Sequence, residues 1–166
     1  MRKSQEVIGL SIIHLQTGRK LGTVSDLLFD ERQKLRGIVL EEGSLFKRQR
    51  FIPISDVVSI GRDAVVVDNE QPSPNPQNEN WMGLYTGQKK LKGRTILTNS
   101  GYEMGFVENV YFLEEVGTLI GYELSGGIIN DIREGRKWLK ATKPLVWGED
   151  VLIASPDQIE VKDAKI

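Results

Sequence analysis

The sequence predicts an all-β protein built from two copies of one small module, and three observations lead to this prediction. Short apolar or β-branched runs alternate with turn residues at the spacing of a small sandwich or barrel. A stretch that begins at Thr17 recurs from Ser100 onward. A polar segment rich in proline separates the two stretches, as expected of a connection between modules.

The first module contains three clear strand-like runs, at 37–40, 51–54 and 64–67. Gly18 and Gly22 stand four residues apart between strand-like segments, which favours a tight hairpin rather than a helix. The only helix-like pieces are short, and 53–58 has room for about one turn. Closure of these strands into a barrel would remove exposed sheet edges from a very small domain.

The second module repeats the order of features of the first. Gly101 lies 83 residues after Gly18, and Gly105 lies 83 residues after Gly22. Further along the chain, Leu119 corresponds to Leu35. The repeat predicts a first module over 1–70, a linker over 71–80, a second module over 81–156 and a polar tail over 157–166. A short terminal strand through 159–161 is the alternative for the tail. Each module is expected to bury a core of its own.

The order of motifs in the first copy identifies a family resemblance. The sequence T-G-x-x-L-G-x-V-x-D-L-L-F-D occupies 17–30, and F-I-P-I-S-D-V-V-S-I-G-x-D-A-V-V-V occupies 51–67. This pattern resembles the PRC-barrel family. In the second copy Lys140 and Ala141 stand where the first has Pro53 and Ile54. The resemblance implies two tandem six-stranded PRC-type β-barrels, of a bacterial type, joined by the proline-rich linker.

The same resemblance implies that the barrels are docking modules rather than enzymes. Members of the family include the cytoplasmic part of a photosynthetic reaction-centre subunit and a ribosome maturation factor that binds a small-subunit ribosomal protein. The family has no common catalytic set, so the resemblance assigns no catalytic residue, no cofactor and no metal to this chain.

The amino-acid composition excludes several classes of function. The formal net charge is −1, which excludes a globally basic nucleic-acid binder. With no cysteine and one histidine, the chain has no disulfide, no cysteine nucleophile and no site of several histidines. No apolar run reaches the roughly 20 residues of a membrane-spanning helix. We therefore expect a cytoplasmic protein that does not span a membrane.

Candidate catalytic groups are isolated in the sequence. His14 lies in a strand-like segment beside a turn and is expected at a turn or strand surface. Glu41 and Glu42 are neighbours, and neighbouring side chains in a strand point to opposite faces. An enzyme or a small-ligand barrel remains the third hypothesis, and barrels of this size fill their interior with side chains.

Two basic runs tipped by an aromatic residue are the candidate binding surface. They occupy corresponding places in the two copies, and the first lies in a window without acidic residues. The predicted partner-binding residues are Lys47, Arg48, Arg50, Arg136, Lys137 and Trp138. The alternative is that both runs are ordinary solvated hairpin ends, with Phe51 and Trp138 turned into the barrel core.

The leading hypothesis is a non-catalytic adaptor whose tandem barrels bind another protein, in ribosome assembly, RNA metabolism or a membrane-associated complex. The alternative is direct RNA binding through the basic hairpins, because a basic loop with an aromatic residue can meet phosphates and stack on a base. Oligomeric state and the relative orientation of the barrels stay open at the level of sequence.

Overall fold

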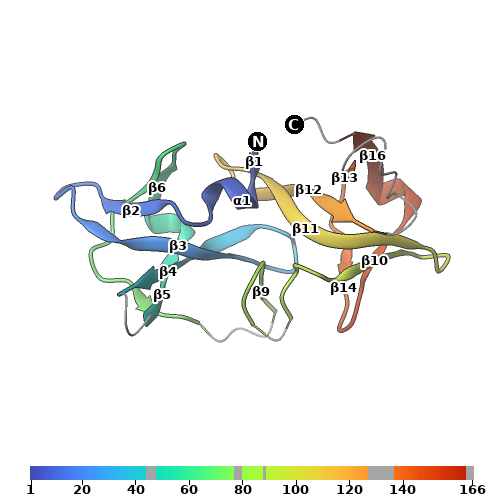
Figure 1. Cartoon of the computed structure of the whole chain (residues 1–166), viewed down its shortest axis with the longest axis horizontal. Coiled ribbons are helices and arrows are strands. Elements are labelled where there is room, and N and C mark those ends of the chain that lie inside the picture. Colours follow the sequence, from blue (N-terminus) through green and yellow to red (C-terminus); the bar gives the residue numbers. More distant parts are fainter. Residues whose placement is uncertain (44–47, 77–79, 88, 127–136, 164–166) are drawn as a thin grey trace.

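The computed structural model describes residues 1–43, 48–76, 80–87, 89–126 and 137–163. Its strands form two sheets, one for each half of the chain (Figure 1). The first sheet contains β2 (Ser11–His14), β3 (Lys20–Phe29), β4 (Leu35–Glu42), β5 (Arg48–Pro53), β6 (Val57–Ile60), β7 (Ala64–Val67), β8 (Ser73–Pro74) and β9 (Met82–Gly83). The second contains β1 (Arg2–Lys3), β10 (Thr95–Thr98), β11 (Glu103–Leu113), β12 (Thr118–Ser125), β13 (Lys137–Ala141), β14 (Val146–Trp147), β15 (Leu152–Ala154) and β16 (Ile159–Asp163).

Helical structure in the described ranges is confined to single turns. These are α1 (Ser4–Val7), η1 (Ile54–Asp56) and η3 (Pro156–Gln158). The prediction of an all-β protein with one-turn helical pieces is therefore confirmed.

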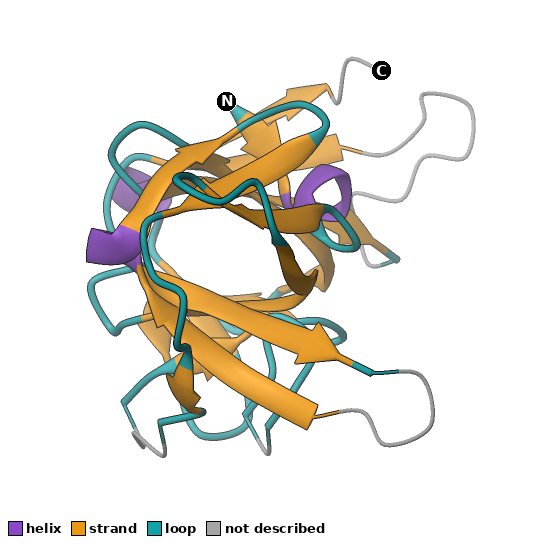
Figure 2. Cartoon of the chain, turned by 90° about the vertical axis from the view of Figure 1, so that its left-hand side faces the viewer, coloured by secondary structure: helices purple, strands orange, loops and turns teal. Residues whose placement is uncertain are grey.

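The two sheets have the same strand order, which confirms the tandem repeat. The first runs β6-β7-β2-β3-β4-β5-β8 and the second runs β14-β15-β10-β11-β12-β13-β16. Their irregularities match as well, because a break in register falls between Ile12 and Ile13 in one copy and between Ile96 and Leu97 in the other. Such bulges bend strands, and Figure 2, which looks along the long axis of the molecule, shows the strands curling around a common centre.

The linker and the tail each contribute a corresponding strand. In the linker, Ser73 of β8 pairs with Phe51 of β5. In the tail, Lys162 of β16 pairs with Trp138 of β13. Within the tail expected at 157–166, the structure thus contains the alternative, a short strand, at Ile159–Asp163. With the exchanged strands β9 and β1, each sheet has eight strands in the described residues, two more than the six expected.

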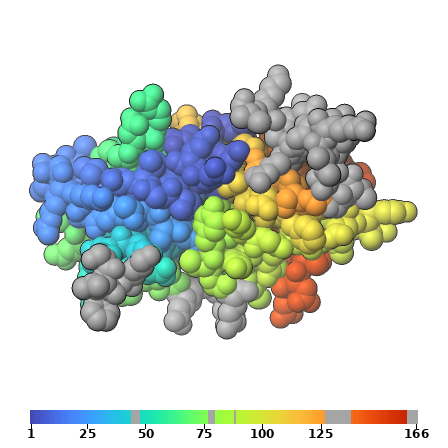
Figure 3. All heavy atoms as spheres, in the orientation of Figure 1, coloured from blue at the N-terminus to red at the C-terminus, as the bar shows by residue number. Residues whose placement is uncertain are grey.

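The two copies also exchange short strands. β1, at the start of the chain, pairs with β11 of the second sheet through Lys3 and Tyr111. β9, which follows the linker, pairs with β3 of the first sheet through Gly83 and Leu28. Figure 3 shows the segment after the linker, in light green, lying against the blue residues of the first half. Each copy therefore completes its sheet with a segment that precedes the other copy.

The β3–β4 and β11–β12 hairpins meet through reciprocal hydrogen bonds. The amide of Leu35 donates to the carbonyl of Gly117 at 2.7 Å, and the amide of Leu119 donates to the carbonyl of Gln33 at 2.9 Å. Since Leu119 and Gly117 are the counterparts of Leu35 and Gln33, the two copies contact each other as the halves of a two-fold dimer do. The corresponding rings Phe29 and Phe112 pack edge to face, with centroids 6.2 Å apart.

Gln33 shows how the contact between the copies constrains the backbone. Its φ is 63° and that of Gly117 is 69°, so both take the left-handed conformation that favours glycine. Gln33 is the only non-glycine residue with a positive φ in the described part of the chain. Its side chain is 2% exposed and donates from Nε2 to the carbonyl of Leu145 at 3.3 Å. The hydrogen bond to Leu145 offsets part of the backbone strain that the positive φ imposes on Gln33, a strain that a glycine would not have.

The expectation of two separate cores is wrong. One continuous cluster of buried apolar side chains includes Ile12 and Ile52 of the first copy together with Ile96 and Leu139 of the second. The exchanged segments and the paired hairpins bring the two interiors together, so the barrels form one packed body. A smaller cluster of Leu28, Val39 and Phe51 lies apart from it and packs against Trp81.

Candidate docking surfaces

The first basic run lies at the end of β5. Lys47 is outside the described residues, whereas Arg48 is exposed to solvent. The Nε of Arg50 lies 3.4 Å from a carboxylate oxygen of Glu42 on the neighbouring strand, so its charge is partly balanced within the sheet. Phe51 is only 6% exposed and its ring lies 5.9 Å from that of Trp81. Of the two described arginines of this run, Arg48 is the more exposed.

The second basic run lies at the start of β13. Arg136 is outside the described residues, and Lys137 begins the strand. Trp138 is half-buried, with its ring 5.1 Å from that of Tyr111 and tilted by 53°. The structure does not bring the two runs together, because β5 and β13 belong to different sheets at opposite ends of the molecule (Figure 1). They are two separate surfaces related by the pseudo-two-fold.

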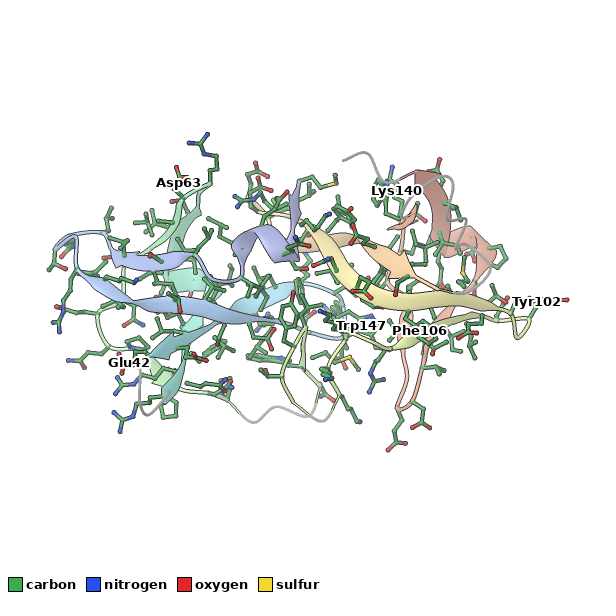
Figure 4. All side chains as sticks on the ribbon, viewed as in Figure 1. Glu42, Asp63, Tyr102, Phe106, Lys140 and Trp147 are labelled. Carbon is green, nitrogen blue, oxygen red and sulfur yellow. The ribbon has the colours of Figure 1, made fainter. Side chains whose placement is uncertain are left out.

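Two exposed aromatic residues were not among the binding residues predicted from the sequence. Tyr102 is 65% exposed and lies at the tip of the β10–β11 hairpin, and Phe106 is 38% exposed and lies further back on β11 (Figure 4). The corresponding residues of the first copy are Arg19 and Thr23. Comparison of the two copies was the signal that could have singled out this pair, since an aromatic residue replaces a polar one at both positions.

A buried polar cluster covers the outer face of β11, β12 and β13. We call Lys3, Asn109, Tyr111, Glu123 and Trp138 the Glu123 cluster. The Nζ of Lys3 lies 2.9 Å from Oε2 of Glu123 and 5.9 Å from the centre of the Tyr111 ring. Glu123 also accepts hydrogen bonds from Tyr111 Oη at 3.3 Å and from Asn109 Nδ2 at 3.1 Å. The Glu123 side chain is 3% exposed, and that of Lys3 is 28% exposed.

The first copy has an apolar patch in the same place. Val39 is the counterpart of Glu123, as Leu28 is of Tyr111 and Phe51 of Trp138. These three side chains form the smaller cluster that Trp81 covers. The second copy has therefore replaced an apolar outer patch by a carboxylate that holds an ammonium group.

Asp26 anchors the exchanged segment on the first copy. Its carboxylate accepts hydrogen bonds from the amides of Leu84, Tyr85 and Thr86 at 2.9, 3.1 and 2.9 Å, and from the hydroxyl of Thr86. A Cβ on Gly83 would lie 2.4 Å from the carboxylate, so the approach requires glycine. Burial raises the pKa of Asp26, while the hydrogen bonds from Thr86, Leu27 and Tyr85 act in the opposite direction.

The one histidine is not at the surface as expected. His14 is 6% exposed in β2, and its Nδ1 lies 2.9 Å from the hydroxyl oxygen of Thr17. Within the described ranges, no group of three or more histidine, aspartate or glutamate side chains is arranged to hold a metal ion. The helical turns of those ranges are all too short to cross a bilayer.

The comparisons with known proteins agree with this architecture. The sequence pattern of the PRC-barrel domain matches residues 1–71. The chain is also similar to the uncharacterized protein YrrD of Bacillus subtilis, with 27% identity over 149 residues that cover 88% of this chain and 82% of that protein. Residues 1–71 therefore correspond to a PRC-barrel domain, and the second half of the chain repeats the strand order of the first.

Proposed function

We propose that this protein is a non-catalytic docking scaffold that binds another protein on the outer surfaces of its two barrels. The observation that carries the proposal is the filled, continuous interior. Side chains as large as Phe29, Tyr122 and Phe112 are completely buried within it. Recognition then falls to the outer surface, because barrels of this size hold side chains where larger ones hold ligands.

The rigid junction between the copies supports a scaffold rather than two domains that bind independently of each other. Strand exchange and the reciprocal hydrogen bonds of Leu35 and Leu119 fix the orientation of one barrel on the other. Surfaces at the two ends of the molecule are thereby held at a constant separation. A scaffold of this kind suits an assembly such as a maturing ribosome, an RNA-processing complex or a membrane-associated complex in the cytoplasm.

The exposed aromatic pair supports a protein as the partner. Tyr102 and Phe106 present ring surface to solvent from the β10–β11 hairpin, and aromatic residues are enriched at the centres of protein interfaces. The buried setting of His14 supports a non-catalytic role, since a general base needs access to a substrate.

Direct RNA binding is the second candidate, and the exposed Arg48 favours it. The ion pair between Arg50 and Glu42 weakens that case, because a neighbouring carboxylate reduces the attraction for phosphate. The experiment must therefore distinguish an RNA partner from a protein partner.

Photo-crosslinking in cells tests the proposal. A photoreactive phenylalanine analogue replaces Tyr102 in one variant and Arg48 in another, and replaces the exposed Val58 on β6 in a control. A light-dependent adduct with one protein at Tyr102 or Arg48, absent at Val58, is the expected result. Adducts that nuclease removes would establish the RNA alternative, and the absence of adducts at both positions would contradict docking on these surfaces.

A further inference from the structure

The charges of Glu123 and Lys3 are not required by this fold, which directs attention to their function. The first copy closes the same outer face with Leu28, Val39 and Phe51 under Trp81. Burial of a carboxylate and an ammonium group costs desolvation that apolar side chains avoid, and apolar replacements of such pairs are often neutral or stabilising. The first copy shows that the fold accepts the apolar version. The buried carboxylate of Glu123 in the second copy therefore indicates that this site recognises a cation.

The geometry of the cluster defines the chemistry of that cation. The carboxylate of Glu123 is held from one side by the Tyr111 hydroxyl and the Asn109 amide, and Lys3 approaches it from the solvent side. The Tyr111 ring lies beside the ammonium group at 5.9 Å, within the range of a cation–π contact. A primary ammonium on a long flexible stem matches this site. A phosphate would be repelled by the carboxylate.

The strand that delivers Lys3 is well suited to replacement. β1 has only two residues, and its register on β11 places Arg2 opposite Phe112 and Lys3 opposite Tyr111. Very short strands with partly exposed side chains and few contacts belong to the least stable parts of a fold. Addition of an extended segment to the edge of a sheet is also a recurrent mode of peptide recognition.

We propose that the Glu123 cluster is a docking site for an extended, lysine-bearing segment of a partner protein, which adds to β11 in place of β1. The chain's own Lys3 fills the site when the partner is absent. This inference rests on the proposed docking function and specifies one of its surfaces. Arg2, whose Nη1 donates to the carbonyls of Ile60 at 3.2 Å and Gly61 at 2.9 Å, is the second anchor that the partner must displace.

Peptide binding to an opened form of the full chain tests the inference. The opened variant carries Arg2→Ser and Lys3→Ser, and the probe is a fluorescent peptide with the sequence of residues 1–9. We expect the opened variant to bind this peptide and the unaltered chain to bind it at least about tenfold more weakly, because the unaltered chain fills its own site. Fluorescence anisotropy measures both affinities.

Substitutions on each side of the contact identify the cation site. Lys3→Met in the peptide, or Glu123→Gln in the opened variant, is expected to weaken binding at least about tenfold, as for a charge-assisted hydrogen bond. Glu42→Gln in the opened variant makes the same chemical change on a surface strand of the first copy and is expected to leave binding unaltered. Equal binding before and after Glu123→Gln would overturn the proposal.

The remaining outcomes also decide the question. If the opened variant loses its circular dichroism spectrum, β1 is an obligatory part of the fold and the inference is wrong. If the opened variant folds but does not bind the peptide, the inference is wrong as well. Protein crosslinks at Tyr102 or Arg48 that persist in either case would retain the general docking function, so the two failures are distinguishable.

Discussion

Asp26 of β3 and Asn109 of β11 occupy the same bulge of the two copies, and each binds the segment that leads into the other copy. Asp26 accepts hydrogen bonds from the backbone of 84–86, whereas Asn109 accepts one from the hydroxyl of Ser4 at 2.9 Å. In each barrel the polar side chain at this bulge therefore helps to fasten the exchanged strand. The carboxylate of Asp26 accepts from several backbone amides. The side-chain amide of Asn109 accepts from a single hydroxyl.

Replacement of Asp26 by asparagine is expected to destabilise the protein at neutral pH by about 1–3 kcal/mol, the cost of leaving buried donors unsatisfied. The asparagine amide keeps one acceptor oxygen, and its NH2 group, placed where Oδ2 stood, faces the amide and hydroxyl donors of Thr86. Urea unfolding of both proteins measures the difference in free energy. Asp63→Asn on an exposed turn, where the side chain is 81% exposed, is the matched control and is expected to change little. Equal stabilities of the Asp26→Asn variant and the unaltered protein would contradict the role of Asp26.

The pKa of Asp26 predicts a specific dependence of stability on pH. Because burial raises the pKa in the folded state, the folded protein binds more protons than the unfolded chain between about pH 3.9 and that raised value. The contribution of Asp26 to the free energy of unfolding therefore increases as the pH falls through this window. The difference in stability between the unaltered protein and Asp26→Asn, which lacks this titration, should grow on acidification. A difference that shrinks would mean that the hydrogen bonds outweigh burial.

Gly117 tests the contact between the two hairpins. Alanine there must adopt a φ near 69°, and its Cβ would lie 3.2 Å from that of Leu35 in the other copy. Gly101→Ala imposes a similar backbone strain at a φ of 88° with no atom within 4 Å, and that strain costs about 1–2 kcal/mol. We expect Gly117→Ala to lower the thermal midpoint further than Gly101→Ala does. Equal shifts would show that the contact with Leu35 adds nothing to the strain.

The all-β class, the repeat and the positions of several turns could be predicted because they depend on local patterns such as paired glycines and short apolar runs. The exchange of β1 and β9 could not be, because two-residue strands such as Arg2–Lys3 leave no periodic signal. The merged core followed from that exchange. Among the candidate binding residues, sequence located the basic runs, but only the fold showed that Arg50 meets Glu42 and that Trp138 meets Tyr111.

The merged core predicts that the two copies stay together without a covalent linker. A protease site inserted between Pro76 and Asn80 leaves β8 with the first fragment and β9 with the second, so every exchanged contact is retained. After cleavage we expect both fragments to co-elute at micromolar concentration, with a thermal midpoint that now rises with protein concentration. The uncut insertion variant is the control, and its midpoint should not depend on concentration. Separation of the fragments at micromolar concentration would show that the linker, rather than strand exchange and the shared core, holds the barrels together.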